Sequence, residues 1–310
     1  MEISLLLMQQ IAQLFLILIM GYAVVKAGLL KASDSRVLSV VMVYLVTPCV
    51  IINAFQIDDT PEIRKGLLYS MAIAAAIHVV LLVLSALLSR PLKLDAVEQV
   101  NVIYSNAAAL VIPLVKALMG DAYVIYSCAF IIVQLVLLWT HASSLLQGSS
   151  ALDWKKVLTN INMIAIAAGA LLYWFRVVLP APLQNTMSTV GNMMGPMGML
   201  LAGMAIAEKP LREVFCTRRN YLPTVLRLVV CPLVVLVLLW VCHASSWVAD
   251  GKNILMTVYL AASTPACATV TSMAQLYDRD AAHSSALYVL TTLLSIVSMP
   301  VMIGLFDLLL

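Results

Sequence analysis

Long apolar runs constrain the fold of this chain more than any other feature. Ten of them follow one another with short connections, and we place them at residues 5–25, 37–55, 67–88, 97–118, 122–142, 157–178, 183–207, 222–242, 254–276 and 284–309. Each is close to the roughly 20 residues that an α-helix needs to cross a hydrocarbon core of about 30 Å. Of the residues, 63% are hydrophobic and 11% are charged, and the mean hydropathy is +1.02. The sequence therefore predicts an all-α polytopic membrane protein with ten transmembrane helices, and it excludes an ordinary soluble domain.

Positive charges predict the orientation of these helices. Of the 18 Lys and Arg residues, twelve lie on odd-numbered connections and five on even-numbered connections or the helix ends beside them. The remaining one, Arg227, lies inside the eighth span about one turn from its start, a position that favours a side chain snorkelling to the interface. Because Lys and Arg accumulate on cytoplasmic connections, the odd-numbered connections are predicted to be cytoplasmic. Both termini would then face outward.

An internal repeat is indicated by the position of the longest polar connection. This connection, residues 143–156, divides the spans five and five, so we expect one unit at 1–148 and a second at 149–310. Five is odd, and a duplicated five-helix unit must therefore insert its second copy upside down, as in many secondary transporters. The second spans of the halves carry Pro48 and Pro196, and the fourth spans align Tyr104 with Tyr259 and both carry a proline.

Prolines in the fourth and ninth spans predict interrupted helices. A proline donates no backbone N–H and clashes with the preceding turn, so Pro113 and Pro265 would leave the carbonyls of Ala109 and Ala261 without partners. In hydrocarbon, such backbone is tolerated where it lines a polar cavity or is satisfied by neighbours. Two interruptions that cross at mid-membrane would direct helix N-termini at one point, which suits an anion. A simple proline kink packed by small residues is the alternative, and the duplicated interruption favours the binding site.

Three stretches resemble a known family. They are "NAAALVIPLVKALMG" at 106–120, "GMLLAGMAIAEKPL" at 198–211 and "STPACATVTSMAQLYDRDAAHSSALYVLTTLLSIVSMP" at 263–300. They resemble the fourth, seventh, ninth and tenth spans of the auxin efflux carrier family, which includes plant auxin exporters and bacterial permeases, and the similarity runs nearly end to end. Val111 and Val270 replace a glycine and a second proline of the plant members. These departures favour the bacterial, malonate-transporter-like branch.

The resemblance implies a specific architecture. It is a transporter of two inverted five-helix repeats in which broken helices 4 and 9 cross at prolines, similar to NhaA-type antiporters and bile-acid transporters. Spans 1, 2, 6 and 7 would form a scaffold beside a mobile transport domain. A bacterial inner-membrane location, a homodimer and a small carboxylate substrate follow from the same resemblance. The many methionines, which cluster at 193–199, would either form an adaptable sliding surface or fill gaps between helices.

The candidate site residues follow from the breaks and from the resemblance, which matches Asn106 to a substrate-contacting asparagine. The predicted substrate-binding residues are Asn53, Ser105, Asn106, Pro113, Thr264, Pro265, Ala266 and Cys267. Thr271 is a candidate for ion coupling. Lys116 either attracts an anion or snorkels to the interface.

These features predict a secondary carrier that moves a small organic anion by alternating access at the crossing. The alternative is a membrane sensor that binds a ligand there without net transport. An enzyme is not expected, because HExxH, GxSxG and a buried carboxylate pair are missing from the sequence. No cofactor, metal or nucleic acid is expected. The lipid bilayer is the expected surrounding, and H⁺ or Na⁺ is a possible coupling ion.

Overall fold

The computed structural model describes residues 2–56, 60–148, 159, 161–207, 211–248 and 250–310. Within this part, the secondary structure is helical apart from one isolated antiparallel bridge. Residues 149–156 of the predicted central connection and Lys209 lie outside the described part. The predicted boundary between the two five-helix units, at residues 148 and 149, coincides with the end of the described segment 60–148.

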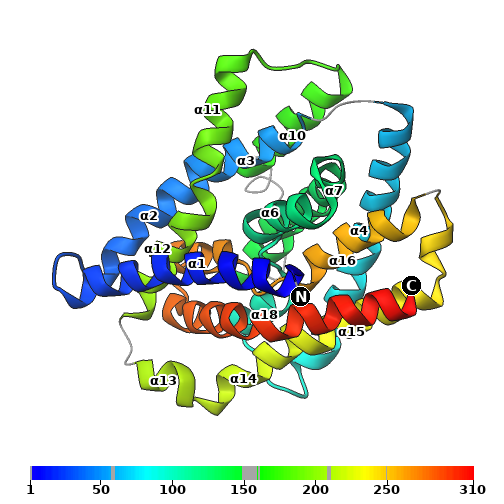
Figure 1. Cartoon of the computed structure of the whole chain (residues 1–310). Helices are drawn as coiled ribbons and strands as arrows, with labels where there is room; N and C mark the ends of the chain where they lie inside the picture. The colour runs from blue at the N-terminus through cyan, green and yellow to red at the C-terminus, as the bar shows by residue number, and fades with distance from the viewer. Residues whose placement is uncertain (1, 57–59, 149–158, 160, 208–210, 249) are drawn as a thin grey trace.

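Among the described residues, eight α-helices belong to the first half of the chain, and Figure 1 colours this half from blue to green. They are α1 (Glu2–Lys26), α2 (Ser35–Val41), α3 (Thr47–Ala54), α4 (Pro61–Ser89), α5 (Ala96–Ile103), α6 (Ala107–Met119), α7 (Asp121–Leu137) and α8 (Ser143–Gln147). A 3₁₀ turn, η1 (Ala32–Asp34), precedes α2. Two π-helical turns, η2 (Met42–Val46) and η3 (Leu138–Ala142), connect α2 to α3 and α7 to α8.

The second half follows a similar order of long and interrupted helices. They are α10 (Ile161–Trp174), α11 (Ala181–Gly191), α12 (Met194–Ile206), α13 (Leu211–Cys216), α14 (Arg218–Val225), α15 (Cys231–Val241), α16 (Gly251–Ser263), α17 (Ala268–Leu276) and α18 (Ala281–Leu309). The π turn η4 (Leu226–Val230) joins α14 to α15, and the 3₁₀ turn η5 (Ala244–Ser246) follows α15.

Each predicted span overlaps helical residues. Six continuous helical stretches are long and apolar enough to cross a membrane: Ala32–Asn53, Pro61–Ser89, Ala122–Gln147, Ala181–Ile206, Arg218–Val241 and Ala281–Leu309. Two shorter apolar helical stretches, Phe15–Lys26 and Ile161–Trp174, lie within the first and sixth predicted spans. The fourth and ninth predicted spans are the interrupted pairs α5–α6 and α16–α17. The chain is therefore a helical multi-pass membrane protein.

Local sequence signals explain several helix boundaries. Thr60 caps α4 through its hydroxyl, which accepts the Ile63 N–H at 3.3 Å, and Pro61 occupies the first helical position, where no N–H is needed. Prolines also account for two π turns. Pro48 and Pro232 are the second residues after the ends of η2 and η4, and neither has an N–H to continue the α-helical ladder.

Glycines allow α1 and α12 to pack backbone against backbone, and the two helices cross in Figure 1. A Cβ built on Gly203 would clash with the Leu18 carbonyl oxygen and lie 2.8 Å from the Tyr22 nitrogen. A Cβ on Gly21 would clash with the Leu200 carbonyl in the same way. Membrane helices associate through such small residues, because lipid gives no hydrophobic drive for helices to associate.

The helices group into two bundles by their contacts. In one group, α1 packs against α12, while α3 packs against α10 and α11. In the other, α7 packs against α4, α6 and α16, while α15 packs against α16. The long helix α18 contacts both groups, through α12 on one side and α14 and α17 on the other. The first group contains the helices of spans 1, 2, 6 and 7, which the resemblance assigns to the scaffold.

The close approach of α1 and α12 can be tested with one methyl group. Gly203→Ala is expected to destabilise the protein by about 1–3 kcal/mol, because the added Cβ must push the α1 backbone away. Gly304→Ala is the matched control, since nothing lies within 4 Å of a Cβ at that position. Thermal unfolding in detergent measures both variants. Equal midpoints for the two variants would contradict this description of the helix pair.

Candidate functional site at the crossing of two broken helices

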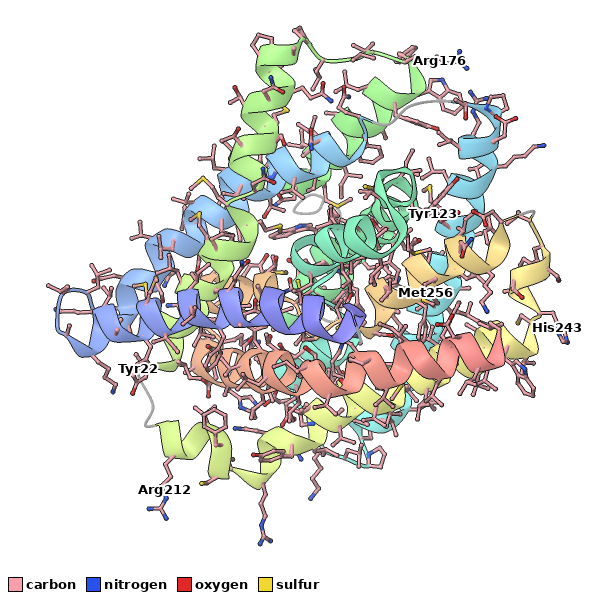
Figure 2. All side chains as sticks on the ribbon, in the orientation of Figure 1. Tyr22, Tyr123, Arg176, Arg212, His243 and Met256 are labelled. Carbon is pink, nitrogen blue, oxygen red and sulfur yellow. The ribbon has the colours of Figure 1, made fainter. Side chains whose placement is uncertain are left out.

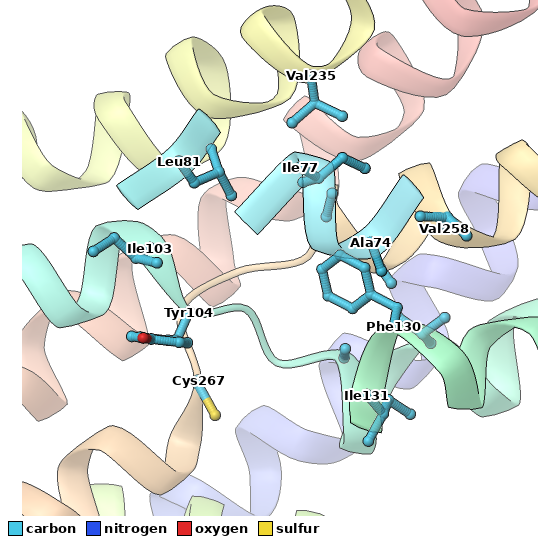
Figure 3. Packing of buried hydrophobic residues seen from close by; sticks show 14 of the residues in the cluster. Ala74, Ile77, Leu81, Ile103, Tyr104, Phe130, Ile131, Val235, Val258 and Cys267 are labelled. Atoms are coloured by element: carbon cyan, nitrogen blue, oxygen red, sulfur yellow. The ribbon is translucent and has the colours of Figure 1, made fainter. Parts of the chain in front are cut away.

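Two broken helices cross through their extended segments. The α5–α6 pair is interrupted at residues 104–106, and the α16–α17 pair at residues 264–267. Ser105 and Ala266 form an antiparallel bridge between them. The Asn106 N–H donates to the Pro265 carbonyl at 2.8 Å, and the Cys267 N–H donates to the Tyr104 carbonyl at 3.1 Å. Figure 3 shows the two extended segments crossing, with Tyr104 and Cys267 beside the crossing point.

The predicted crossing is therefore present, but its position in the first half was predicted wrongly. Pro113 lies inside α6, well after the break, whereas Pro265 lies in the break itself. The predicted alignment of Tyr104 with Tyr259 is wrong too. Tyr104 is the first residue after α5, and Tyr259 lies inside α16. The prediction of an unpaired carbonyl at Ala261 is also wrong, since that oxygen accepts the Thr264 hydroxyl at 3.0 Å.

Side chains from neighbouring helices satisfy the exposed backbone of the crossing. The Gln134 amide oxygen accepts the Ser105 N–H at 2.9 Å and the Ser105 hydroxyl at 2.7 Å. The Gln134 amide nitrogen donates to the Ser105 carbonyl at 2.8 Å. On the other segment, the Ala266 N–H donates to the Thr291 hydroxyl at 3.1 Å. These bonds replace the helical hydrogen bonds that both segments have given up.

Asn106 connects the crossing to the other bundle. Its side chain is 3% exposed, and its amide nitrogen donates to the Tyr288 hydroxyl at 3.3 Å. The Tyr288 hydroxyl in turn donates to the thioether sulfur of Met199 in α12 at 3.1 Å. Asn106 directly precedes α6, and the first N–H groups of a helix have no intrahelical acceptors.

Arg227 is the main residue that the sequence prediction missed. It does not snorkel, because it is 1% exposed and its side chain reaches the crossing. Nη1 donates to the carbonyls of Val102 and Ile103, each at 3.1 Å. Nη2 donates to Ala262 at 2.5 Å and to Thr264 at 2.9 Å, and Nε donates to Thr264 at 3.0 Å. All five N–H groups of a guanidinium are thereby used.

The π turn η4 explains how Arg227 reaches this point. Arg227 is the second residue of η4, which widens the helix before Pro232. π turns occur often at functional sites because they redirect side chains. An arginine inside an apolar span, five residues before a proline, is the signal that could have identified it, since ionisable groups within the membrane are functional candidates by default.

The other predicted residues are placed as follows. Thr264, Pro265, Ala266 and Cys267 form the extended segment of the crossing together with Ser105 and Asn106. Thr271 lies one turn into α17, and its hydroxyl lies 3.1 Å from the Ser284 hydroxyl, at the first turn of α18. Asn53 lies in α3, which packs against α10 and α11, and no described contact joins it to the crossing. The side chains of Pro113 and Lys116 lie outside the described part, so the role of Lys116 stays a prediction.

Four helix ends meet at this crossing. The C-termini of α5 and α16 present carbonyl groups, and the N-termini of α6 and α17 present N–H groups. A helix end carries roughly half an elementary charge, positive at the N-terminus and negative at the C-terminus. Arg227 lies on the carbonyl ends, and helix N-termini are the ends at which anionic groups bind. The arrangement suits reversible binding of a small anion.

A second polar cluster lies where α5, α14 and α18 begin. Glu98 is 1% exposed and forms a bidentate pair with Arg219, with both N–O distances at 2.6 Å. Glu98 also forms a capping box with Asp95, and a His283 ring nitrogen lies 3.6 Å from its carboxylate. The ligand atoms of Asp95, Glu98 and His283 lie within 4.8 Å of one another. Because Arg219 and the capping box already occupy Glu98, we interpret the cluster as a clasp between three helices.

The fold and the crossing define a multi-pass membrane protein with a polar site built from interrupted helices, the kind of site used by membrane carriers. A family model described as "Membrane transport protein" matches residues 6–152 and 150–303. The chain belongs to this family of membrane transport proteins, in agreement with the resemblance to auxin efflux carriers. No curated protein matches the chain.

Gln134 offers a test of how the crossing is held. Gln134→Leu is expected to destabilise the protein by about 2–6 kcal/mol, because the N–H and the carbonyl of Ser105 lose their partners in a buried place, at about 1–3 kcal/mol each. Gln147→Leu is the control, since Gln147 is exposed and, among the described residues, its amide donates to the Ser143 hydroxyl. Thermal midpoints in detergent measure the difference. If Gln134→Leu unfolds no earlier than the control, Gln134 does not support the crossing.

The clasp can be tested with a double-mutant cycle. Glu98→Gln and Arg219→Gln are each expected to destabilise the protein, and the double variant less than the sum of the two. The expected coupling energy is about 1–3 kcal/mol, because the carboxylate is buried although Arg219 is partly exposed. Thermal unfolding of the four proteins measures it. Additive effects would show that the pair contributes no coupling.

Proposed function

We propose that the chain is a secondary carrier that moves a small organic anion, a carboxylate, across a bacterial inner membrane. Substrate binds at the crossing of α5–α6 and α16–α17, and the two bundles expose it to alternate sides. The proposal places the chain in the bacterial, malonate-transporter-like branch of its family. It includes two inverted five-helix repeats, outward termini and a homodimer as expected features.

One observation carries this proposal. Two helices are interrupted at the same point and tied by the Ser105–Ala266 bridge, so that the N-termini of α6 and α17 lie together next to Asn106 and Cys267. Interrupting two membrane helices costs hydrogen bonds, and many secondary carriers have such interruptions at their substrate and ion sites. A carboxylate matches this site because both helix N-termini and an amide side chain donate hydrogen bonds to it.

The contact between the two bundles supports alternating access. It is formed by a hydrophobic cluster of α1, η2, α12, α13, α17 and α18, in which four of the fourteen buried members are methionines. Two of its polar contacts end on methionine sulfur: Tyr288 on Met199 and Ser272 on Met42, the latter at 3.4 Å. Thioether side chains adapt to new neighbours and are weak acceptors. Such a contact surface supports sliding between two arrangements at small cost.

The distribution of positive side chains supports the proposed orientation. Figure 2 shows Arg212 at one end of the molecule, well separated from Arg176. Arg212 belongs to an odd-numbered connection and Arg176 to an even-numbered one. The positive-inside rule then assigns the Arg212 end to the cytoplasm.

Asn106 provides the direct test of this function. In proteoliposomes, Asn106→Ala is expected to lower uptake of labelled monocarboxylates and dicarboxylates about tenfold, because the site loses one donor to the carboxylate. Asn185→Ala is the control, since Asn185 is exposed on α11. Imposed sodium, proton and voltage gradients in the same assay identify the coupling ion.

Three outcomes are informative. Selective loss in Asn106→Ala supports the proposal. Unchanged uptake of every acid that the parent carries would remove Asn106 from the site. Binding of an acid to the purified parent without any uptake would favour the sensor over the carrier.

A further inference from the structure

Arg227 carries a full positive charge into the centre of the crossing. It is 1% exposed, and its hydrogen-bond partners among the described residues are four backbone carbonyls, those of Val102, Ile103, Ala262 and Thr264. The described ion pairs involve Arg36, Arg219 and His283, and none of them involves Arg227. A guanidinium keeps its proton in proteins. The buried charge is therefore held by dipoles and not by a carboxylate.

The four carbonyls resemble the oxygen ligands of a cation site. They come from the ends of two half-helices, α5 and α16, and converge on one point. In carriers with interrupted helices, unwound carbonyls and half-helix C-termini bind the coupling Na⁺. Here the guanidinium occupies that place and uses every one of its N–H groups. A cation is thus covalently attached to α14–η4–α15 and cannot leave with the substrate.

The charges at the crossing can be added. The C-terminal ends of α5 and α16 contribute roughly half a negative charge each, which Arg227 cancels. The N-terminal ends of α6 and α17 contribute roughly half a positive charge each. The crossing therefore keeps a surplus of about one positive charge, which one monovalent anion neutralises. A second negative charge would have no counterpart among these groups.

We infer that Arg227 is a resident cation of the crossing, which replaces a cotransported sodium ion and makes the site selective for a monovalent organic anion. This inference rests on the proposed carrier function and adds the substrate charge and the coupling to it. A dicarboxylic acid would be carried in its singly protonated form. Transport would move net negative charge and would respond to membrane voltage without sodium.

Transport by charge variants tests this inference. Proteoliposomes holding the parent, Arg227→Lys or Arg227→Met are given labelled lactate, pyruvate, malonate or succinate in sodium or choline buffer, with and without a potassium–valinomycin potential. The parent is expected to give equal uptake in both buffers and to respond to voltage. Arg227→Met should lose at least about tenfold in choline buffer, because the buried charge is gone, while Arg227→Lys keeps part of the uptake. Parental uptake that disappears in choline, or full uptake by Arg227→Met in choline, would overturn the inference.

A rescue experiment tests Arg227 without any substrate. Millimolar guanidinium chloride should raise the thermal midpoint of Arg227→Ala above its value in choline chloride, since the free ion can occupy the carbonyl cage. Arg36→Ala is the control, because Arg36 pairs with Asp278 at the exposed surface and leaves no buried cage. Parental stability of Arg227→Ala with no effect of guanidinium would contradict the inference. Should Arg227→Ala fail to fold, recovery of folded Arg227→Lys but not Arg227→Met supports it, and equal recovery of the two refutes it.

The two experiments separate the inference from the proposed function. A parent that carries none of the four acids would count against the carrier, while guanidinium rescue would still show the resident cation. A parent that carries an acid only with sodium would support the carrier and refute the resident cation.

Discussion

Inside a bilayer, every backbone N–H and carbonyl must find a partner within the protein, and the crossing of the two broken helices depends on this constraint. Two extended segments there give up their helical hydrogen bonds. Their polar groups are satisfied by each other through the Ser105–Ala266 bridge, by Gln134 and Thr291, and by Arg227. Remote helices thereby fix the position of the crossing, and the N-termini of α6 and α17 are the groups that the proposed function assigns to the ligand.

The two sides of the crossing have different mechanical properties. Toward α7 and η4, the contacts are several short hydrogen bonds from Gln134 and Arg227, which hold the segments rigidly. Toward α12 and η2, two of the contacts are hydroxyl to thioether, and the surrounding cluster is rich in methionine. A rigid site beside an adaptable contact surface is what movement of one bundle against the other requires. The glycine-mediated packing of α1 on α12 keeps the other bundle together.

The sequence predicted well what depends on hydropathy and composition. Each of the ten apolar runs overlaps helix, and the fourth and ninth are interrupted. The break near Pro265 was also located, since proline fixes it and Thr264 adopts the extended conformation expected before a proline. In the first half the prediction failed, because Pro113 is accommodated inside α6 and the real break at Tyr104–Asn106 contains no proline.

The break at Tyr104–Asn106 is specified by tertiary contacts, which cannot be recognised from the sequence alone. Gln134 lies 29 residues from Ser105, and Arg227 lies 124 residues from Ile103. The same holds for the assignment of Arg227, which looks like an interfacial anchor until its π turn and its four carbonyl partners are seen. Asn53, a polar residue in an apolar span that was assigned to the site, lies in α3 with no described contact to the crossing, so its role stays a prediction.

A disulfide between Ser105→Cys and Ala266→Cys, in a chain whose six native cysteines are replaced, tests the crossing most directly. The flanking hydrogen bonds make this a non-hydrogen-bonded antiparallel pair, whose Cα atoms lie about 4.5 Å apart, within the range that a disulfide can span. Mild oxidation of the protein in membranes should join the two positions, and a reductant should separate them. Failure to join, with both cysteines shown to react singly with a thiol reagent, would contradict the crossing on which the account depends.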